Sequence, residues 1–419
     1  MHRLFVVLLL SLAQLGIPDQ SAAAKGLTLS QLIATALRES KELQAARFVE
    51  AKARARLVQA GLLPNPSLEL SNKNDRLFAN EGEYTTSIGF SQKFPVAGRI
   101  ARQKDVARVD IDLALAEISE AERKHAGEVA TAFYRALILN RQIEARDHLI
   151  EFDRKLLEAA RNRFRAAEVS EIDVNVAQLD LQRLSQERAS LVSERLTQLG
   201  QLNQLLGRAA TQPLALDETI PSMDTLPSLA DQQRRALDHR PDLRSAVLNV
   251  RRARADQELA RAERFEDWTV GVGVERSRTV IEGAPPQPSN NALALNLSIP
   301  LPLLNNNEGR IAETIATGAQ ANAQIAALRQ SISNEVARVF AEIKRLQQAI
   351  IEYEFAMLPL SESNVRLTLD GYGRGQVPIN DVVQAGRQQA DVNIAYLATL
   401  DLYLQAWAKL RTATADYLK

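Results

Sequence analysis

The sequence contains no cysteine, and only 5% of its 419 residues are aromatic. Without thiols the chain has no thiol nucleophile, no thiolate metal site and no cysteine that could carry an N-terminal lipid. The small aromatic share argues against a compact aromatic core. Ala, Leu, Gln, Arg and Glu dominate instead, which is typical of long helices packed through small residues.

A net charge of either sign is also missing. The 51 basic and 51 acidic residues cancel, so no overall field draws the chain to nucleic acid or to an anionic membrane surface. The cluster Arg251, Arg252 and Arg254 is interleaved with acidic residues, and we interpret it as a solvated helix face. No nucleic-acid partner is expected.

Long apolar runs are absent, and the one at the N-terminus is short. It extends from Leu4 to Leu15, follows the basic start His2-Arg3, and precedes the small residues Ser21 to Ala24. A helix that spans a bilayer needs about 20 apolar residues. We therefore predict that residues 1–24 are a cleaved secretory signal peptide, and that the exported product has no helical membrane anchor.

The remaining chain contains two similar halves, with equivalent segments offset by about 200 to 211 residues. The matching pairs are 36–43 with 236–243, 98–101 with 309–312, 128–130 with 335–337, and 169–174 with 377–382. Solenoid repeats are only about 20–50 residues long, so we interpret the pattern as one duplicated structural half. The expected units are a first repeat over 25–207, a linker over 208–228 and a second repeat over 229–419.

Each half is predicted to contain a helical stretch (about 30–60 and 229–264), two strands and a long helical hairpin. Four segments alternate in the manner of strands, with one largely apolar face. The members of that face are Leu68 and Leu70; Tyr84, Thr86, Ile88, Phe90, Gln92 and Phe94; Trp268, Val270, Val272 and Val274; and Leu293, Leu295, Leu297 and Ile299. This alternation fits either a soluble sheet packed on helices or an outer-membrane barrel. The signal peptide favours the barrel, and four strands cannot close one, so several chains have to pool their strands.

The helical segments are unusually long. Between Ile325 and Ile350 apolar residues recur every three or four positions and form one sustained stripe. The run from Gly309 to Tyr372 is interrupted only by Pro359, and the run from Arg99 to Arg165 has no proline. At 1.5 Å per residue each reaches roughly 90–100 Å, which favours a hollow helical barrel or a stalk over a globule.

Over its whole mature length the chain resembles the TolC family of outer-membrane efflux proteins. The motifs that carry the likeness are 27–29, 60–66, 92–99, 300–302 and 371–378. The Leu-Pro-Asn-Pro and Phe-Pro-x-x-Gly-Arg elements resemble the branch that serves heavy-metal cation exporters (CzcC-like proteins). The resemblance implies a mainly helical fold and a homotrimer, in which four strands per chain form a 12-stranded barrel in the outer membrane. An α-barrel would cross the periplasm to a periplasmic adaptor and an inner-membrane resistance-nodulation-division (RND) pump.

No catalytic arrangement is evident, and neither a cofactor nor a bound metal is expected. His125 and His148 are too far apart in sequence for a helical metal pair, which requires i, i+4 spacing, and His239 is isolated. We interpret all three as surface or interhelical residues. The glycines of Gly371-x-Gly373-x-Gly375 mark a hairpin tip and not a phosphate loop.

The two hairpin tips are the candidate site. In the family such turns form the periplasmic mouth and receive the adaptor, so the resemblance implies adaptor contacts for Ala167, Glu168, Val169 and Ser170, and for Gly375, Gln376, Val377 and Pro378. It also implies that Asp381 lines the closed mouth as a ring of carboxylates. Tyr372 and Asp173 match positions that bridge neighbouring helices and keep the mouth shut.

The residues alone also permit a structural interpretation of the tip aspartates. Ser170-x-x-Asp173 fits a capping box, and both Asp173 and Asp381 favour a helix N-terminus through the macrodipole. The sequence departs from the family at Val377, where some members have an arginine, and at Ala167, where glycine is common. We therefore expect the residues that close the gate to interact differently from those of other members.

Three functions remain open at this point. The preferred one is the outer-membrane duct of an efflux system that conducts metal cations; the same duct could serve organic compounds or type I secretion. The second is a periplasmic coiled-coil adaptor or scaffold, which leaves the two-fold repeat unexplained. The third is a secreted enzyme with helical decoration, for which the sequence offers no catalytic residues.

Overall fold

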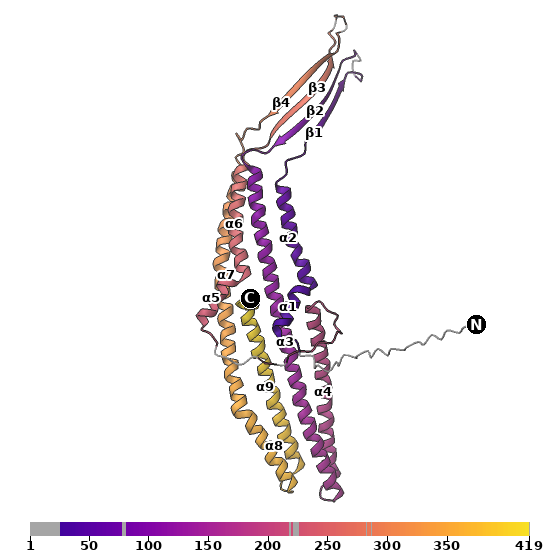
Figure 1. The fold of residues 1–419 in the computed structure, drawn as a ribbon, viewed down its shortest axis with the longest axis vertical. Coiled ribbons are helices and arrows are strands. Elements are labelled where there is room, and N and C mark those ends of the chain that lie inside the picture. The colour runs from indigo at the N-terminus through magenta and orange to yellow at the C-terminus, as the bar shows by residue number, and fades with distance from the viewer. Residues whose placement is uncertain are drawn as a thin grey trace, which may run out of the picture.

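The computed structural model describes residues 26–77, 81–217, 219–220, 226–281, 283–285 and 287–418. The predicted signal peptide, and residues 218 and 221–225 of the predicted linker, lie outside the described residues. The molecule is elongated: a sheet stands at one end and two helical hairpin turns lie at the other (Figure 1).

The first half of the chain begins with α1 (Leu29–Glu39), α2 (Lys41–Ala60), β1 (Ser67–Asn74) and β2 (Tyr84–Phe94). The hairpin α3 (Arg99–Arg165) and α4 (Glu171–Leu205) follows. The second half has α5 (Leu229–His239), α6 (Pro241–Ala262), β3 (Trp268–Arg278), β4 (Asn290–Ser298), α7 (Glu308–Glu352), a π-helical segment (Tyr353–Met357), α8 (Leu358–Gly373) and α9 (Ile379–Ala413). A short 3₁₀ turn, Asp416–Leu418, ends the described chain.

The long helices confirm the sequence prediction, because α3 has the bounds expected for it and extends over 67 residues, or about 100 Å. The predicted stripe on α7 is also confirmed: Ile332, Val336, Ile343 and Ile350 are all fully buried. The second long run is not continuous, however. A π-helical segment precedes Pro359, whose ring nitrogen cannot donate the next α-helical hydrogen bond.

Each helical stretch expected at the start of a half is divided into two helices. Ser40 and Arg240 occupy the breaks and have extended backbone, with ψ of 124° and 125°. The Ser40 hydroxyl accepts a hydrogen bond from Leu43 N and caps α2. Pro241 disfavours a helical conformation for the residue before it, so α5 ends at His239 and α6 begins at the proline.

The four strands form one antiparallel sheet in the order β1-β2-β3-β4. The register aligns the apolar face: Leu68 pairs with Phe90, Phe90 with Val272, and Val272 with Leu295. The opposite face carries Gly89 paired with Gly273, in line with Glu69 and Ala294. Within the described residues neither β1 nor β4 has a partner on its outer edge.

The principal core lies midway along the molecule, where the short helices α1 and α5 pack against α3, α7 and α9. Leu32, Tyr134 and Leu404 are among its fully buried side chains. Small residues permit close helix packing: a Cβ atom at Gly127 would come within 2.4 Å of Thr412 Oγ1. This core holds the two hairpins side by side and directs their turns to the same end.

Candidate functional site

The two hairpin turns share one backbone design. In the first turn Ala167 N donates to Phe164 O and Glu168 N donates to Arg163 O. In the second, Gly375 N donates to Tyr372 O and Gln376 N donates to Gly371 O. Both sets are Schellman motifs, which place one residue in the left-handed region. That residue is Ala167 (φ 57°) in the first turn and Gly375 (φ 72°) in the second.

Tyr372 is the centre of the contact between the two tips. Its side chain is buried, with 2% of its surface exposed, and the Arg163 guanidinium lies 4.7 Å from the ring centroid. Arg163 Nη1 donates to Tyr372 O at 2.8 Å, and its Nε pairs with Glu168 at 3.0 Å. Arg163 therefore ties α3 to α8 through a stacked cation and a hydrogen bond.

Asp173 acts on Tyr372 through its charge. Burial raises the pKa of Tyr372; Arg163 lowers it and Asp173 raises it again. The buried Tyr372 hydroxyl has no hydrogen-bond partner of normal geometry among the described residues. In this arrangement the side chain that contacts Tyr372 from the first hairpin is that of Arg163.

The prediction that Ser170 and Asp173 form a capping box is wrong. Ser170 precedes α4, but its side chain makes no capping hydrogen bond; its hydroxyl donates to Asp173 Oδ1 at 3.4 Å instead. Asp173 and Asp381 each lie in the first turn of their helix, where the macrodipole favours a negative charge. Asp381 is exposed and Asp173 is half-buried.

The predicted adaptor residues divide into two groups. The exposed ones are Ala167, Glu168, Ser170, Gly375, Gln376 and Pro378. Val169 and Val377 are half-buried. Val377 folds back on its own turn, because a Cβ at Gly371 would approach Val377 Cγ2 to 3.2 Å. Much of the Val377 side chain therefore packs within its own tip.

Sequence reasoning missed the ion pairs between helices remote in sequence, two of which join the two hairpins. Arg135 on α3 pairs with Asp401 on α9 at 2.5 Å and with Glu194 on α4 at 2.7 Å. Closer to the tips, Arg387 on α9 pairs with Asp180 on α4 at 2.8 Å. These partners are 59 to 266 residues apart, and no local spacing reveals such pairs.

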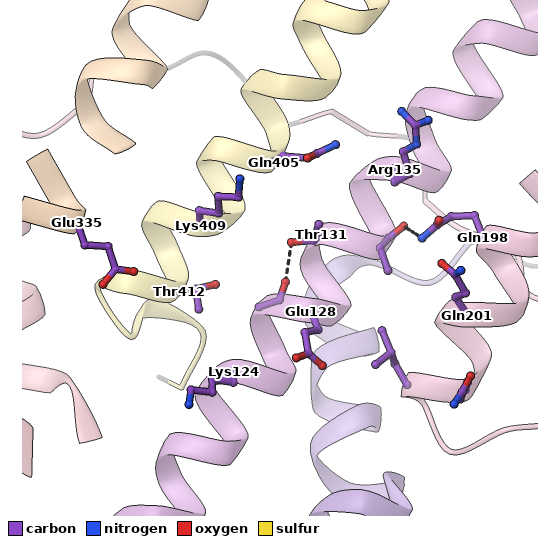
Figure 2. Close-up of a pocket in the computed structure, with 14 residues that line it drawn as sticks. Lys124, Glu128, Thr131, Arg135, Gln198, Gln201, Glu335, Gln405, Lys409 and Thr412 are labelled. Carbon is purple, nitrogen blue, oxygen red and sulfur yellow. Dashed lines mark hydrogen bonds between the residues drawn. The ribbon is translucent and has the colours of Figure 1, made fainter. Parts of the chain in front are cut away.

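A groove of about 790 Å³, with many polar and charged residues along its walls, lies between α3, α4 and α9 (Figure 2). Figure 2 shows charges of both signs around it, including Lys124, Glu128, Arg135 and Lys409. His125, which follows Lys124 on α3, is buried, with its Nε2 2.9 Å from Leu205 O at the end of α4. His125 is thus interhelical, while His148 and His239 are exposed.

The part of the chain that the structure describes holds no group of three or more His, Cys, Asp or Glu residues placed to bind a metal ion. None of its helices is both long and apolar enough to cross a membrane.

The apolar face of the sheet is exposed. Val272, Leu293 and Leu295 have 49%, 68% and 79% of their surface exposed. Aromatic side chains lie near both limits of this face: Trp268 pairs with Phe94 at the end nearer the helices, and Tyr84 pairs with Arg278 at the far end. An apolar band with aromatic side chains near its limits is typical of a lipid-facing strand surface.

These features define a class: a helical duct-like stalk that ends in an open, apolar-faced sheet. The sequence matches the outer membrane efflux protein family over residues 32–208 and 233–416, so the chain belongs to that family. Its members are efflux channels of the outer membrane, which transport and do not catalyse. The resemblance predicted from the sequence is confirmed, as are the outer-membrane location and the mainly helical fold.

Individual relatives agree with this assignment. The chain is 21% identical to the cobalt-zinc-cadmium resistance protein CzcC of Cupriavidus metallidurans, over 92% of this chain and 89% of the relative. It shares the fold of the channel protein CusC (TM-score 0.74, 17% identity, 92% of this chain and 91% of that one). The outer membrane protein VceC of Vibrio cholerae is similar as well (TM-score 0.70, 19% identity, 92% and 95%).

Proposed function

We propose that three copies of the chain assemble into one duct, in which the four-stranded sheets close a 12-stranded barrel. The single observation that carries this proposal is a sheet with an apolar face and two edges that no other described strand pairs with. In lipid each unpaired backbone group costs several kcal/mol, and pooling the strands of several chains removes every edge. The strands have suitable length: β3, with 11 residues, extends about 33 Å, or about 25 Å of membrane height at the usual tilt.

Two substitutions on β4 test the barrel. Leu295 and Asn296 are neighbours on opposite faces of the sheet. Leu295→Arg places a charge in the lipid at a cost of about 2–4 kcal/mol per chain, so it is expected to remove the protein from outer membranes. Asn296→Arg faces the proposed lumen and is expected to leave insertion intact.

Detergent extraction followed by native mass spectrometry then reports the assembly. A trimer that resists carbonate extraction is expected of the unmodified protein. A soluble monomer or dimer, or equal behaviour of the two arginine variants, would refute the barrel and favour a periplasmic scaffold.

We further propose that the cargo consists of divalent metal cations. The support is the likeness to a cobalt-zinc-cadmium resistance protein over most of both chains. Deletion of the protein from its host is expected to lower tolerance to cobalt, zinc or cadmium while leaving tolerance to organic toxins unchanged. The opposite pattern would assign the duct to organic compounds.

At the tips we propose a mouth that meets a periplasmic adaptor and an inner-membrane RND pump. The exposed turn residues Glu168 and Gln376 offer polar adaptor contacts at the free end of the stalk. The element order of each half, two helices, two strands and a hairpin, supports the proposal that the halves are repeats of one unit. Both tips of each chain would then contribute to one ring.

Asp381 is proposed to line this mouth. It is exposed at the start of α9, and three symmetry-related carboxylates around a narrow axis select cations electrostatically. Asp381→Asn is expected to lower cation selectivity and block by divalent cations in bilayer recordings. Asp391→Asn, an exposed change further along α9, serves as the control. Unchanged selectivity in Asp381→Asn would remove Asp381 from the lining.

We also propose that Tyr372 and Asp173 keep the mouth closed. Here the support is the burial of Tyr372 between the tips and the influence of Asp173 on its pKa. A Tyr372→Phe, Asp173→Ala double variant is expected to conduct more at rest. A resting conductance equal to that of the unmodified channel would count against this role.

A further inference from the structure

Two carboxyl groups are buried together where the hairpins meet, several turns from the tips. Asp153 lies on α3 and Asp180 on α4, and each has 5% of its surface exposed. Apolar side chains pack on both sides of the two aspartates along the hairpin axis. One cluster includes Leu156, Leu157 and Val383 towards the tips; the other includes Leu149, Leu184 and Ala390 on the opposite side.

Asp180 connects the two hairpins directly. Its Oδ1 accepts hydrogen bonds from Arg387 on α9 through Nη2 at 2.8 Å and Nε at 3.1 Å, and from Arg183 Nε at 3.2 Å. Gly386, next to Arg387, packs near Phe152 of α3: a Cβ at Gly386 would lie 3.5 Å from the Phe152 ring, an ordinary contact distance. Arg387 thus links α9 to α4 by an ion pair.

Asp153 has no comparable partner. Its Oδ2 is buried and finds no hydrogen-bond donor among the described residues. The charged groups around the pair are Arg183 and Glu187 on α4, Arg146 on α3 and Arg387 on α9; of these, Glu187 already pairs with Arg146 and Arg183. No cation is therefore dedicated to Asp153.

Two adjacent buried carboxylates repel when both are ionised, but share a hydrogen bond when one carries a proton. Burial, reinforced by the charge of Asp180, raises the pKa of Asp153 from 3.8 to about 7, although Arg183 and Arg387 oppose the change. The joined hairpins therefore bind a proton more tightly than separated ones, in which Asp153 regains an ordinary pKa.

We propose that Asp153 and Asp180 form a proton-controlled latch between the two hairpins, closed when Asp153 is protonated and weakened when it is ionised. The sign follows from linkage: the closed state loses stability relative to the open one as pH rises from about 4 to about 7, with no further loss above that. Acid favours the closed mouth, and neutral to mildly alkaline conditions release it.

The latch rests on the proposed function only in that the hairpin ends form the duct mouth. Its test does not require conduction, so the two proposals fail separately. Because the chain has no cysteine, Glu168→Cys and Gln376→Cys place one spin label on each exposed turn. Distances between the labels are measured by pulsed electron resonance, on labelled chains diluted with unlabelled ones in detergent.

The expected result is a population of separated tips that grows at least about tenfold between pH 5 and pH 8, since one pKa unit corresponds to a factor of ten. Asp153→Asn mimics the protonated group and is expected to keep the tips together at both pH values. Asp180→Asn removes the negative partner of Arg387 and is expected to separate them at both.

Asp147→Asn is the matched control. Asp147 lies on α3, is exposed and pairs with Arg188 on α4, so this variant should retain the pH response of the unmodified chain. A pH-independent distance in the unmodified protein would overturn the latch. A response that persists in Asp153→Asn, or disappears in Asp147→Asn, would overturn it as well.

Discussion

The two hairpin tips have the same backbone and opposite side-chain burial. Counting from the left-handed residue of each turn, Phe164 of the first tip corresponds to Tyr372 of the second. Phe164 has 44% of its surface exposed, whereas Tyr372 has 2%. Equivalent positions of a duplicated hairpin thus have different surroundings: one ring fills the contact between the tips, and the other faces away from it.

The difference shows how duplication produces an asymmetric pair. Arg163, on the first hairpin, stacks on Tyr372, on the second; the position equivalent to Arg163 is Gly371, which leaves room for Val377. One contact therefore needs an arginine on one side and a small residue on the other. Phe164 has no such partner contact from the described residues of the second tip and stays exposed.

The largest expected effect comes from truncating the two rings. Tyr372→Ala removes a buried aromatic and is expected to lower the free energy of unfolding by about 3–4 kcal/mol, while Phe164→Ala, at an exposed site, should cost under about 1 kcal/mol. Urea unfolding of the detergent-solubilised protein measures both. Equal costs would mean that the tips are energetically equivalent and that the comparison fails.

A smaller effect is expected for Arg163→Ala. It removes the stacked cation, the hydrogen bond to Tyr372 O and the pair with Glu168, for a loss of about 1–3 kcal/mol. Arg165→Ala, at a solvated position two residues on, is the control and should be nearly neutral. Urea unfolding measures both variants. If Arg163→Ala leaves the free energy of unfolding unchanged, packing of the Tyr372 ring alone would account for the stability of the contact.

The smallest effect distinguishes the turns themselves. Ala167 has φ 57°, a conformation that costs an L-residue roughly 1 kcal/mol, while Gly375 adopts its φ of 72° freely. Ala167→Gly is expected to stabilise the protein by up to about 1 kcal/mol, and Gly375→Ala to destabilise it by a similar amount. Thermal unfolding of the two variants should shift in opposite directions; shifts of the same sign would show that the turns are not equivalent.

Local pattern was sufficient for the extended elements of this protein. The bounds of α3 follow from the absence of proline between Arg99 and Arg165. The buried stripe of α7 and the faces of all four strands follow from periods of about 3.6 and 2. The breaks at Ser40 and Arg240 were not predicted, although Pro241 offered a signal for one of them. The tip residues could be located from Gly375 and Pro378, but their burial could not.

The sequence by itself determined the helices, the strands, the alternating faces and the position of the turns, since these depend on neighbours a few residues away. Only the tertiary structure decided which side chains meet. Arg163 contacts Tyr372, and Asp153 shares a buried level with Asp180 and Arg387, because packing around the central core sets the relative height of helices remote in sequence. The charge and burial of these side chains depend on how the helices are aligned along the long axis of the molecule, and this alignment cannot be read from local sequence periodicity.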